Sequence, residues 1–198
     1  KISFCVVLEK DGALDLFQPV ESEVVKGRSL PMSVLVPGQS KPTGSGINPC
    51  FLWDNATYML GLAPEGREQS WAAKRFEAFR DRHLAVEEEI GDETFSAVCR
   101  FLENWTPEQA ADHPELAEMT GNFGTFRLKG ASEYVHERPA AKDWWRGQVA
   151  VADDGVVEGT CLVTSERLPI ARLHEPFISG VKGCTNKPKL VSFDDPSF

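Results

Sequence analysis

Long apolar runs are absent from this 198-residue sequence: no stretch approaches the roughly 18 residues that a membrane helix needs. The first residues, KISFCVVLEKDG, also lack the charged, apolar and small segments of a secretory signal. Apolar residues still make up 41% of the chain, which is enough for a packed core. We therefore expect a soluble, cytoplasmic, globular protein without a membrane partner.

Cysteines are few and widely spaced, and no two of them form Cys-x-x-Cys. Their odd number and wide separation argue against a disulfide framework or a zinc knuckle. We interpret them as small, reduced core residues. The five are Cys5, Cys50, Cys99, Cys161 and Cys184.

Catalytic motifs are also missing. The His-Glu pairs at 136–137 and 174–175 lack the second histidine of a zinc-protease helix, and no Gly-x-Ser-x-Gly elbow or phosphate-binding Gly-x-x-x-x-Gly-Lys occurs. The Asp-Asp pairs at 153–154 and 194–195 offer oxygen ligands, but the first, followed by glycine, is typical of a turn. We predict no enzyme activity, metal or cofactor; a thiol enzyme built on Cys50, or a metal hydrolase, is the remaining catalytic alternative.

Charge is distributed unevenly along the chain, whose net charge is −9. Residues 87–118 contain ten acids and a single base, Arg100, so this segment carries −9 and the remainder is neutral. Two stretches, 26–50 and 176–193, contain basic residues and no acid. The distribution therefore leaves nucleic acid open as a partner, although the total charge argues against it.

The order of patterns predicts an α+β fold, with a β-hairpin and small mixed sheets flanking a central helical segment. Residues 2–9 and 14–20 are rich in β-forming side chains and are joined through Asp11-Gly12, a dipeptide suited to tight hairpin turns. Further strands are predicted at 32–36, 126–128, 160–164 and 190–193.

Helical periodicity dominates an acidic lobe at about residues 66–120. An apolar stripe with spacings of three and four predicts one long amphipathic helix, in which His83 is interpreted as a core histidine. Asp92 can cap a second helix, and TPEQ at 106–109 is a capping box with proline in the first turn. Another helix is predicted after Pro139. The first stripe is Ala72, Phe76, Phe79, His83, Val86 and Ile90, and the second is Phe95, Val98, Leu102 and Trp105.

The loop 39–48, QSKPTGSGIN, has the composition of a nucleic-acid contact. Glycine lets a backbone approach a ligand closely, while lysine, serine and asparagine side chains supply hydrogen bonds. A plain flexible connector is the alternative, and the apolar residues at 51–53 favour the first reading because they can bury one end of the loop. The predicted contacts here are Lys41, Ser45, Gly46 and Asn48.

A second basic loop, GVKGCTNKPKL at 180–190, offers the same chemistry, and Pro188 stiffens it. The predicted contacts here are Lys182, Thr185, Asn186, Lys187 and Lys189. On the first helix, Trp71, Arg75 and Arg82 fall within about 40° of each other, since an α-helix turns by about 100° per residue. This flank suits an arginine stacked on tryptophan or a phosphate contact, and a solvated face is the alternative.

Several strings in order, from the first residue to the last, resemble one known family. They are INPCFLWDNATYMLGL, RFEAFRDRHL, RFLENWTPEQ, NFGTFRL, YVHERPAAKDWW, CLVTSERLPIARLHEPFISGVKG and LVSFDDPSF. The chain resembles the N-terminal part of the large subunit of the type I-C CRISPR effector complex, Cascade. We therefore expect residues 1–198 to be the N-terminal domain of a longer subunit.

The resemblance implies a non-catalytic subunit that binds the Cascade backbone subunits and the CRISPR RNA. It also implies recognition of the protospacer-adjacent motif on double-stranded DNA, help in opening the duplex and recruitment of the helicase-nuclease; phage inhibitor proteins are further expected partners. The loop at 184–189 is slightly shorter than is usual in the family and lacks glutamine. The alternative function is that of an adaptor that docks a basic protein on its acidic helical lobe.

Overall fold

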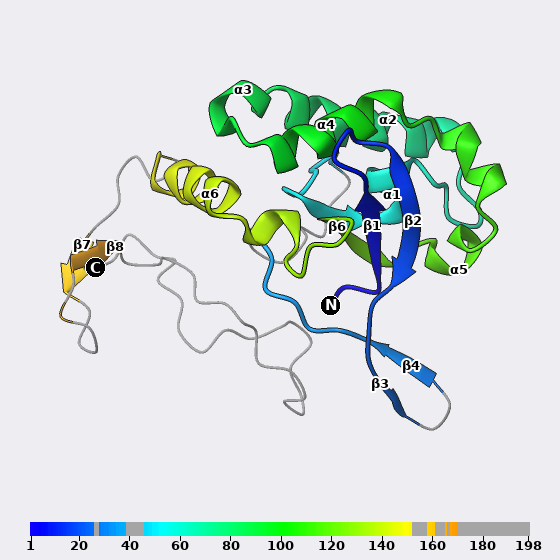
Figure 1. The fold of residues 1–198 in the computed structure, drawn as a ribbon, viewed down its shortest axis with the longest axis horizontal. Helices are drawn as coiled ribbons and strands as arrows, with labels where there is room; N and C mark the ends of the chain where they lie inside the picture. Colours follow the sequence, from blue (N-terminus) through cyan, green and yellow to red (C-terminus); the bar gives the residue numbers. More distant parts are fainter. Residues whose placement is uncertain (26–27, 39–45, 152–157, 161–164, 166, 170–198) are drawn as a thin grey trace, which may run out of the picture. The chain divides into compact units, whose positions relative to one another are not determined.

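A computed structural model describes residues 1–25, 28–38, 46–151, 158–160, 165 and 167–169 (Figure 1). The chain divides into two compact units, residues 1–148 and 149–198, and the second contributes an antiparallel pair, β7 (Glu158–Thr160) and β8 (Arg167–Pro169). The first unit combines helices with a small mixed sheet, which confirms the α+β prediction. Among the described residues, no helix combines the length and apolarity needed to cross a membrane.

The sheet of the first unit has four strands in the order β2 (Leu14–Pro19), β1 (Phe4–Leu8), β6 (Phe123–Leu128) and β5 (Trp53–Asn55). β1 pairs antiparallel with β2 and parallel with β6, and every residue of β1 is buried. The hairpin predicted through Asp11-Gly12 is confirmed: Gly12 has a φ of +91°, and the Asp11 carboxylate accepts from the amide of Ala13. A side chain at Gly12 would collide with the helix α4 (Glu93–Asn104), so this turn packs against a helix.

A second hairpin, β3 (Glu21–Val25) and β4 (Arg28–Pro31), was not predicted. The strand expected at 32–36 is wrong, because only Met32 forms a β-bridge, with Ile2. The following residues bond elsewhere: the Leu35 carbonyl contacts Nε2 of His136. The apolar side chains alternate in this stretch because Val34 and Val36 pack against a smaller core cluster that includes Ile2 and Trp53. They do not pair in a sheet.

The central helices occupy residues 56–119. The long helix that the sequence predicts up to Ile90 ends at Leu84. Two residues later, Val86 has a φ of −116° and a ψ of 5°, which is not a helical conformation. Its predicted stripe nevertheless faces the core, because Ala72, Phe76 and Phe79 are buried. The elements are α1 (Ala56–Leu60), α2 (Gln69–Leu84), α3 (Glu87–Ile90), α4 (Glu93–Asn104), the 3₁₀ helix η1 (Pro107–Asp112) and α5 (Leu116–Met119).

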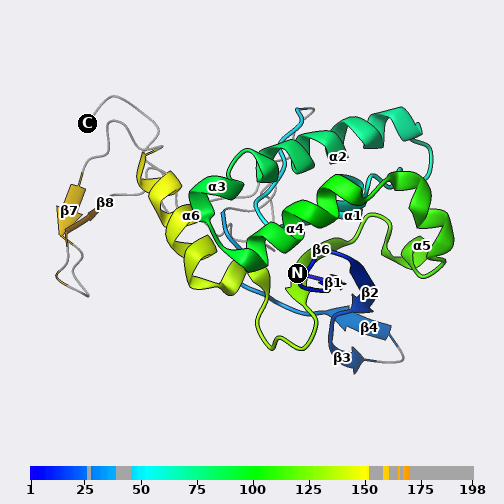
Figure 2. The same ribbon diagram turned by 45° about the horizontal axis from the view of Figure 1, so that its top comes forward.

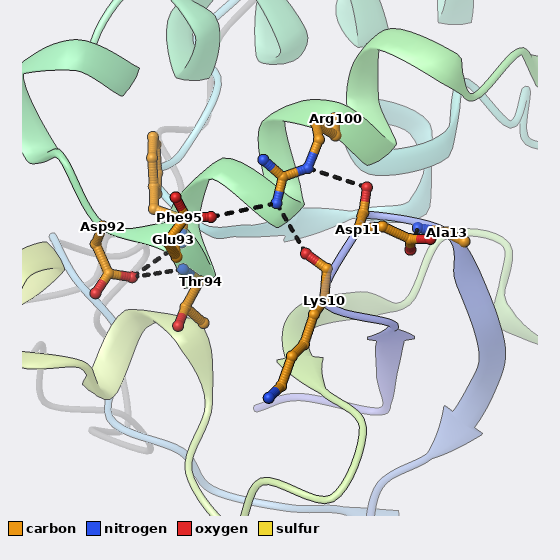
Figure 3. A network of polar contacts seen from close by, with 8 residues as sticks. All are labelled: Lys10, Asp11, Ala13, Asp92, Glu93, Thr94, Phe95 and Arg100. Carbon is orange, nitrogen blue, oxygen red and sulfur yellow. Dashed lines mark hydrogen bonds and ion pairs between the residues drawn. The ribbon is translucent and has the colours of Figure 1, made fainter.

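The predicted caps are confirmed. The Asp92 carboxylate accepts from the backbone amides of Thr94 and Phe95 at 2.9 and 3.0 Å, which satisfies two free amides at the start of α4 (Figure 3). In the same view, Arg100 donates to the Lys10 and Asp11 carbonyls and so ties α4 to the β1–β2 turn. The capping box at 106–109 also forms, although it begins a 3₁₀ helix.

Helices α2 and α4 lie side by side in both views (Figures 1 and 2). Because side chains alternate along β1, Phe4, Val6 and Leu8 join the main core with the helices, while Cys5 and Val7 join the smaller cluster. After β6 come the 3₁₀ helix η2 (Val135–Glu137) and α6 (Pro139–Val151), which confirms the helix predicted after Pro139. Of the strand expected at 160–164, β7 contains the first residue; positions 161–164 and 190–193 lie outside the described residues.

Candidate nucleic-acid interface

The structure describes part of the predicted DNA-contact set. Gly46 and Asn48 are both exposed at the end of the first loop. The other predicted contacts lie outside the described residues: Lys41, Ser45, Lys182, Thr185, Asn186, Lys187 and Lys189. The structure therefore describes the residues at the two ends of the first loop and the side chains that contact them.

An aromatic anchor follows the loop, as the sequence predicts. Phe51 and Leu52 are fully buried, and Trp53 is 7% exposed. The Phe51 ring stacks on Trp145 with a centroid distance of 5.4 Å and also contacts the Trp144 ring at 4.8 Å. The prediction that residues 51–53 bury one end of the loop is confirmed.

Leu52 adopts a strained backbone conformation at the centre of this anchor. Its φ is +61°, a region that residues other than glycine rarely occupy and that costs on the order of 1–3 kcal/mol. Its amide donates to Nε2 of His83 at 2.9 Å, and its carbonyl accepts from the Thr125 hydroxyl at 3.0 Å. Two buried side chains from α2 and β6 thus hold the strained residue.

His83 is the core histidine that the sequence predicts. Its Nδ1 lies 2.7 Å from the Phe79 carbonyl, so Nδ1–H donates there and Nε2 is free to accept from Leu52. Burial lowers the pKa of His83 to about 4, which keeps the ring neutral. With no exposed surface, this histidine serves the fold rather than acid–base chemistry.

Further hydrogen bonds fix both sides of the loop. Before it, the Pro37 carbonyl accepts from Nε1 of Trp53 at 2.7 Å. At its last residue, the Asn48 amide donates to the Tyr58 hydroxyl at 3.2 Å, and just after it Arg82 donates to the Pro49 carbonyl. The described residues on both sides of positions 39–45 are therefore held by the same part of the fold.

Sequence reasoning identified the apolar anchor but not these polar supports. The hydroxyl of Tyr58 bonds the loop, a contact that the sequence did not indicate. Arg82 was placed on the α2 flank; it contacts Pro49 and lies 5.8 Å from the Trp145 ring, and burial lowers the pKa of its guanidinium. Helical spacing was the available signal for Arg82, whereas nothing local indicated its partner 33 positions away.

The arginine–tryptophan stack predicted on α2 forms with Arg75. Its guanidinium carbon lies 3.5 Å from the centroid of the Trp71 ring, and Nη1 donates to the Trp71 carbonyl at 3.0 Å. Arg67 lies 5.1 Å from the same ring. This cluster is close to the loop, since Arg75 also lies 6.0 Å from the ring of Tyr58.

The described residues contain no group of three or more His, Cys, Asp or Glu side chains that could hold a metal ion. The thiols of Cys5 and Cys99 are free and buried, and burial raises the pKa of Cys5 to about 12. Cys50 is half-buried. The prediction of reduced core cysteines is confirmed for Cys5 and Cys99; Cys161 and Cys184 lie outside the described part.

Comparison with known families places the chain among the CRISPR-associated proteins. The match extends over residues 1–198, and the chain belongs to the family described as CRISPR-associated protein (Cas_Csd1). No curated protein matches the sequence. The resemblance is thus confirmed at the coarser level of a CRISPR-associated protein.

Proposed function

We propose that residues 1–198 form the N-terminal domain of a large subunit of type I-C Cascade and recognise the protospacer-adjacent motif on double-stranded DNA. The domain assists duplex opening and helicase-nuclease recruitment, and it works with the Cascade backbone subunits and CRISPR RNA. Membership of the CRISPR-associated family supports this proposal. The observation that carries it is the loop 39–48, clamped at both ends beside buried aromatic residues.

A clamped loop suits a short-motif reader for two physical reasons. RNA–DNA pairing reads most of the target in such complexes, so the protein needs contacts to only a few base pairs. Holding the loop ends in place before binding reduces the conformational entropy lost on binding. Asn48 supplies an amide that can pair with a base edge, while Lys41 supplies a mobile charge suited to phosphate.

The proposal is tested with the intact subunit assembled with its Cascade partners and CRISPR RNA. Equilibrium binding is measured for DNA duplexes that differ only in the sequence next to the target. We expect one motif to bind more tightly, by about 1–3 kcal/mol for each base contact. Equal affinity for every adjacent sequence would contradict motif recognition.

The subunit itself is proposed to be non-catalytic. Incubated with Mg²⁺ or Mn²⁺, the purified protein is expected to leave single- and double-stranded DNA and RNA intact. The decisive controls are Asp154→Ala and Asp194→Ala, which remove one carboxylate from each acidic pair. Cleavage that disappears in either variant would show that the protein has a metal-dependent active site.

A second candidate, an adaptor for a basic protein, is favoured by the acidic lobe. Glu88 and Glu89 are exposed on α3, and the side chain of Glu93 at the start of α4 is 96% exposed. Salt-dependent retention on DNA separates the two candidates. An adaptor would bind its protein partner through these acids and would not distinguish one duplex from another.

A further inference from the structure

One flank of α2 and the turn before it carries two arginines that contact the same tryptophan. Arg75 lies 3.5 Å and Arg67 lies 5.1 Å from the Trp71 ring centroid. We call these residues, Arg67, Trp71 and Arg75, the arginine–tryptophan cluster. Two like charges held near one ring repel each other, so the cluster would be stabilised by an anion.

Neither arginine of the cluster forms an ion pair with any carboxylate among the described residues. Elsewhere in the first unit, cationic side chains do find such partners: Arg80 pairs with Asp81 at 3.0 Å, and Arg138 pairs with Glu133 at 2.6 Å. Arg80 is on the same helix, about 180° around the axis from Trp71 by the turn of about 100° per residue. The absence of an ion pair among the described residues therefore distinguishes Arg67 and Arg75 from Arg80.

The geometry of Arg75 leaves donors available. Its guanidinium is stacked on the indole, and one of its N–H groups is used on the Trp71 carbonyl at 3.0 Å. The remaining N–H groups form no hydrogen bond with other described residues. A guanidinium fixed by stacking loses little side-chain freedom when it binds phosphate, and its fork of donors matches two phosphate oxygens.

The cluster is also joined to the proposed reading loop. Arg75 lies 6.0 Å from the Tyr58 ring, and the Tyr58 hydroxyl accepts from the Asn48 amide at 3.2 Å. One side chain thus separates the cluster from the end of the loop. A duplex whose adjacent motif meets the loop would have its sugar–phosphate backbone within reach of this flank.

We propose that the arginine–tryptophan cluster binds the phosphate backbone of double-stranded DNA beside the reading loop. This inference rests on the proposed function, since the loop determines which ligand lies there. The contacts are non-specific: Arg67 and Arg75 add affinity for any duplex, while the loop discriminates between motifs. Trp71 orients Arg75 through the stack and does not read bases.

The test uses the assembled complex and measures duplex affinity at several salt concentrations, for the preferred and a scrambled motif. Arg67→Gln and Arg75→Gln are each expected to lower the slope of log affinity against log salt by about 0.9, equally for both duplexes. Arg75→Lys keeps the charge and is expected to retain most of the slope. Arg80→Gln, on the opposite flank, is the matched control and is expected to leave the slope unchanged.

The outcomes separate this inference from the proposed function. A wild-type complex that prefers its motif, together with unchanged slopes in both cluster variants, overturns the cluster and leaves motif reading intact. A wild-type complex without motif preference, whose slope still falls in the variants, supports the cluster and contradicts motif reading. Variants that instead lose CRISPR RNA or a protein subunit from the complex, with normal DNA binding, overturn the assignment of the cluster to duplex DNA.

Discussion

At the scale of single residues, the anchor depends on polar groups that are buried and almost fully paired. His83 accepts a hydrogen bond from the Leu52 amide, and Thr125 donates one to the Leu52 carbonyl. Thr125 also lies 2.9 Å from Nδ1 of His136, whose Nε2 contacts the Leu35 carbonyl. A buried donor or acceptor that loses its partner costs about 1–3 kcal/mol, so these side chains are more critical than their small number suggests.

The neutral state of His83 predicts a pH dependence of stability. Its folded pKa of about 4 lies below the ordinary value of 6.5, so the unfolded chain binds the proton more readily. The contribution of His83 to the free energy of unfolding is therefore fully present above pH 6.5. It falls by about 3 kcal/mol as the pH decreases from 6.5 to 4. Urea unfolding of the wild type and of His83→Gln, which does not titrate, measures the difference. Parallel curves over that range would contradict a neutral buried histidine.

At the scale of elements, local signals predicted most turns and caps. Asp11-Gly12 and Asp92 act through atoms within three residues of themselves, so their roles can be read from short strings. The break between α2 and α3 was missed because Val86 and Ile90 continue the apolar spacing although the backbone turns at 85–86. The hairpin at 21–31 was missed because its strands lack a clear apolar alternation and form a sheet of their own.

Contacts between distant segments explain what was missed at the candidate site. Residues 51–53 were recognisable as an anchor from their aromatic and apolar side chains. The parallel pairing of β1 with β6 joins segments more than 100 residues apart, and the bond from Leu52 to His83 spans 31 positions. No periodicity or short motif encodes such pairs, since they depend on how complete elements pack.

The cap of α4 gives a prediction at this scale. Asp92→Ala removes a carboxylate that accepts from two amides, and it is expected to lower the free energy of unfolding by about 0.5–2 kcal/mol. The matched control is Glu68→Ala at the start of α2, where the cap residue forms no such bond and a smaller loss is expected. Chemical denaturation of both variants provides the measurement. Equal losses of unfolding free energy in the two variants would mean that the hydrogen bonds of Asp92 do not stabilise the protein.

At the scale of the whole molecule, acidic and basic side chains are concentrated in different segments of the chain. The ten acids of residues 87–118 lie on the helical segment. By contrast, Arg82 donates to the Pro49 carbonyl just after the proposed reading loop, and Arg75 lies near Tyr58, whose hydroxyl bonds the last residue of the loop. Phosphate is repelled by a surface rich in carboxylates, so the segment 87–118 suits solvent or a protein partner.

This segregation predicts the result of neutralising the acidic surface. Replacing Glu87, Glu88 and Glu89 with glutamine is expected to leave motif preference unchanged, because none of these side chains belongs to the proposed reader. Glutamine at position 89 keeps an oxygen that can accept from Nε1 of Trp144. Competition binding between duplexes with different adjacent motifs gives the measurement, and a switch in the preferred motif would contradict the division of surfaces.

The central claim is that an anchored loop reads the adjacent motif, and comparing Asn48→Ala with Lys41→Ala in the assembled complex tests it most directly. The measured quantity is affinity for the preferred and scrambled duplexes over a range of salt concentrations. Asn48→Ala is expected to lose about 1–3 kcal/mol on the preferred motif alone, and Lys41→Ala to weaken both duplexes with a slope lower by about 0.9. The same contrast is expected between Asn186→Ala and Lys187→Ala in the second loop. If all four variants bind both duplexes with wild-type affinity and salt dependence, these loops are not the reader.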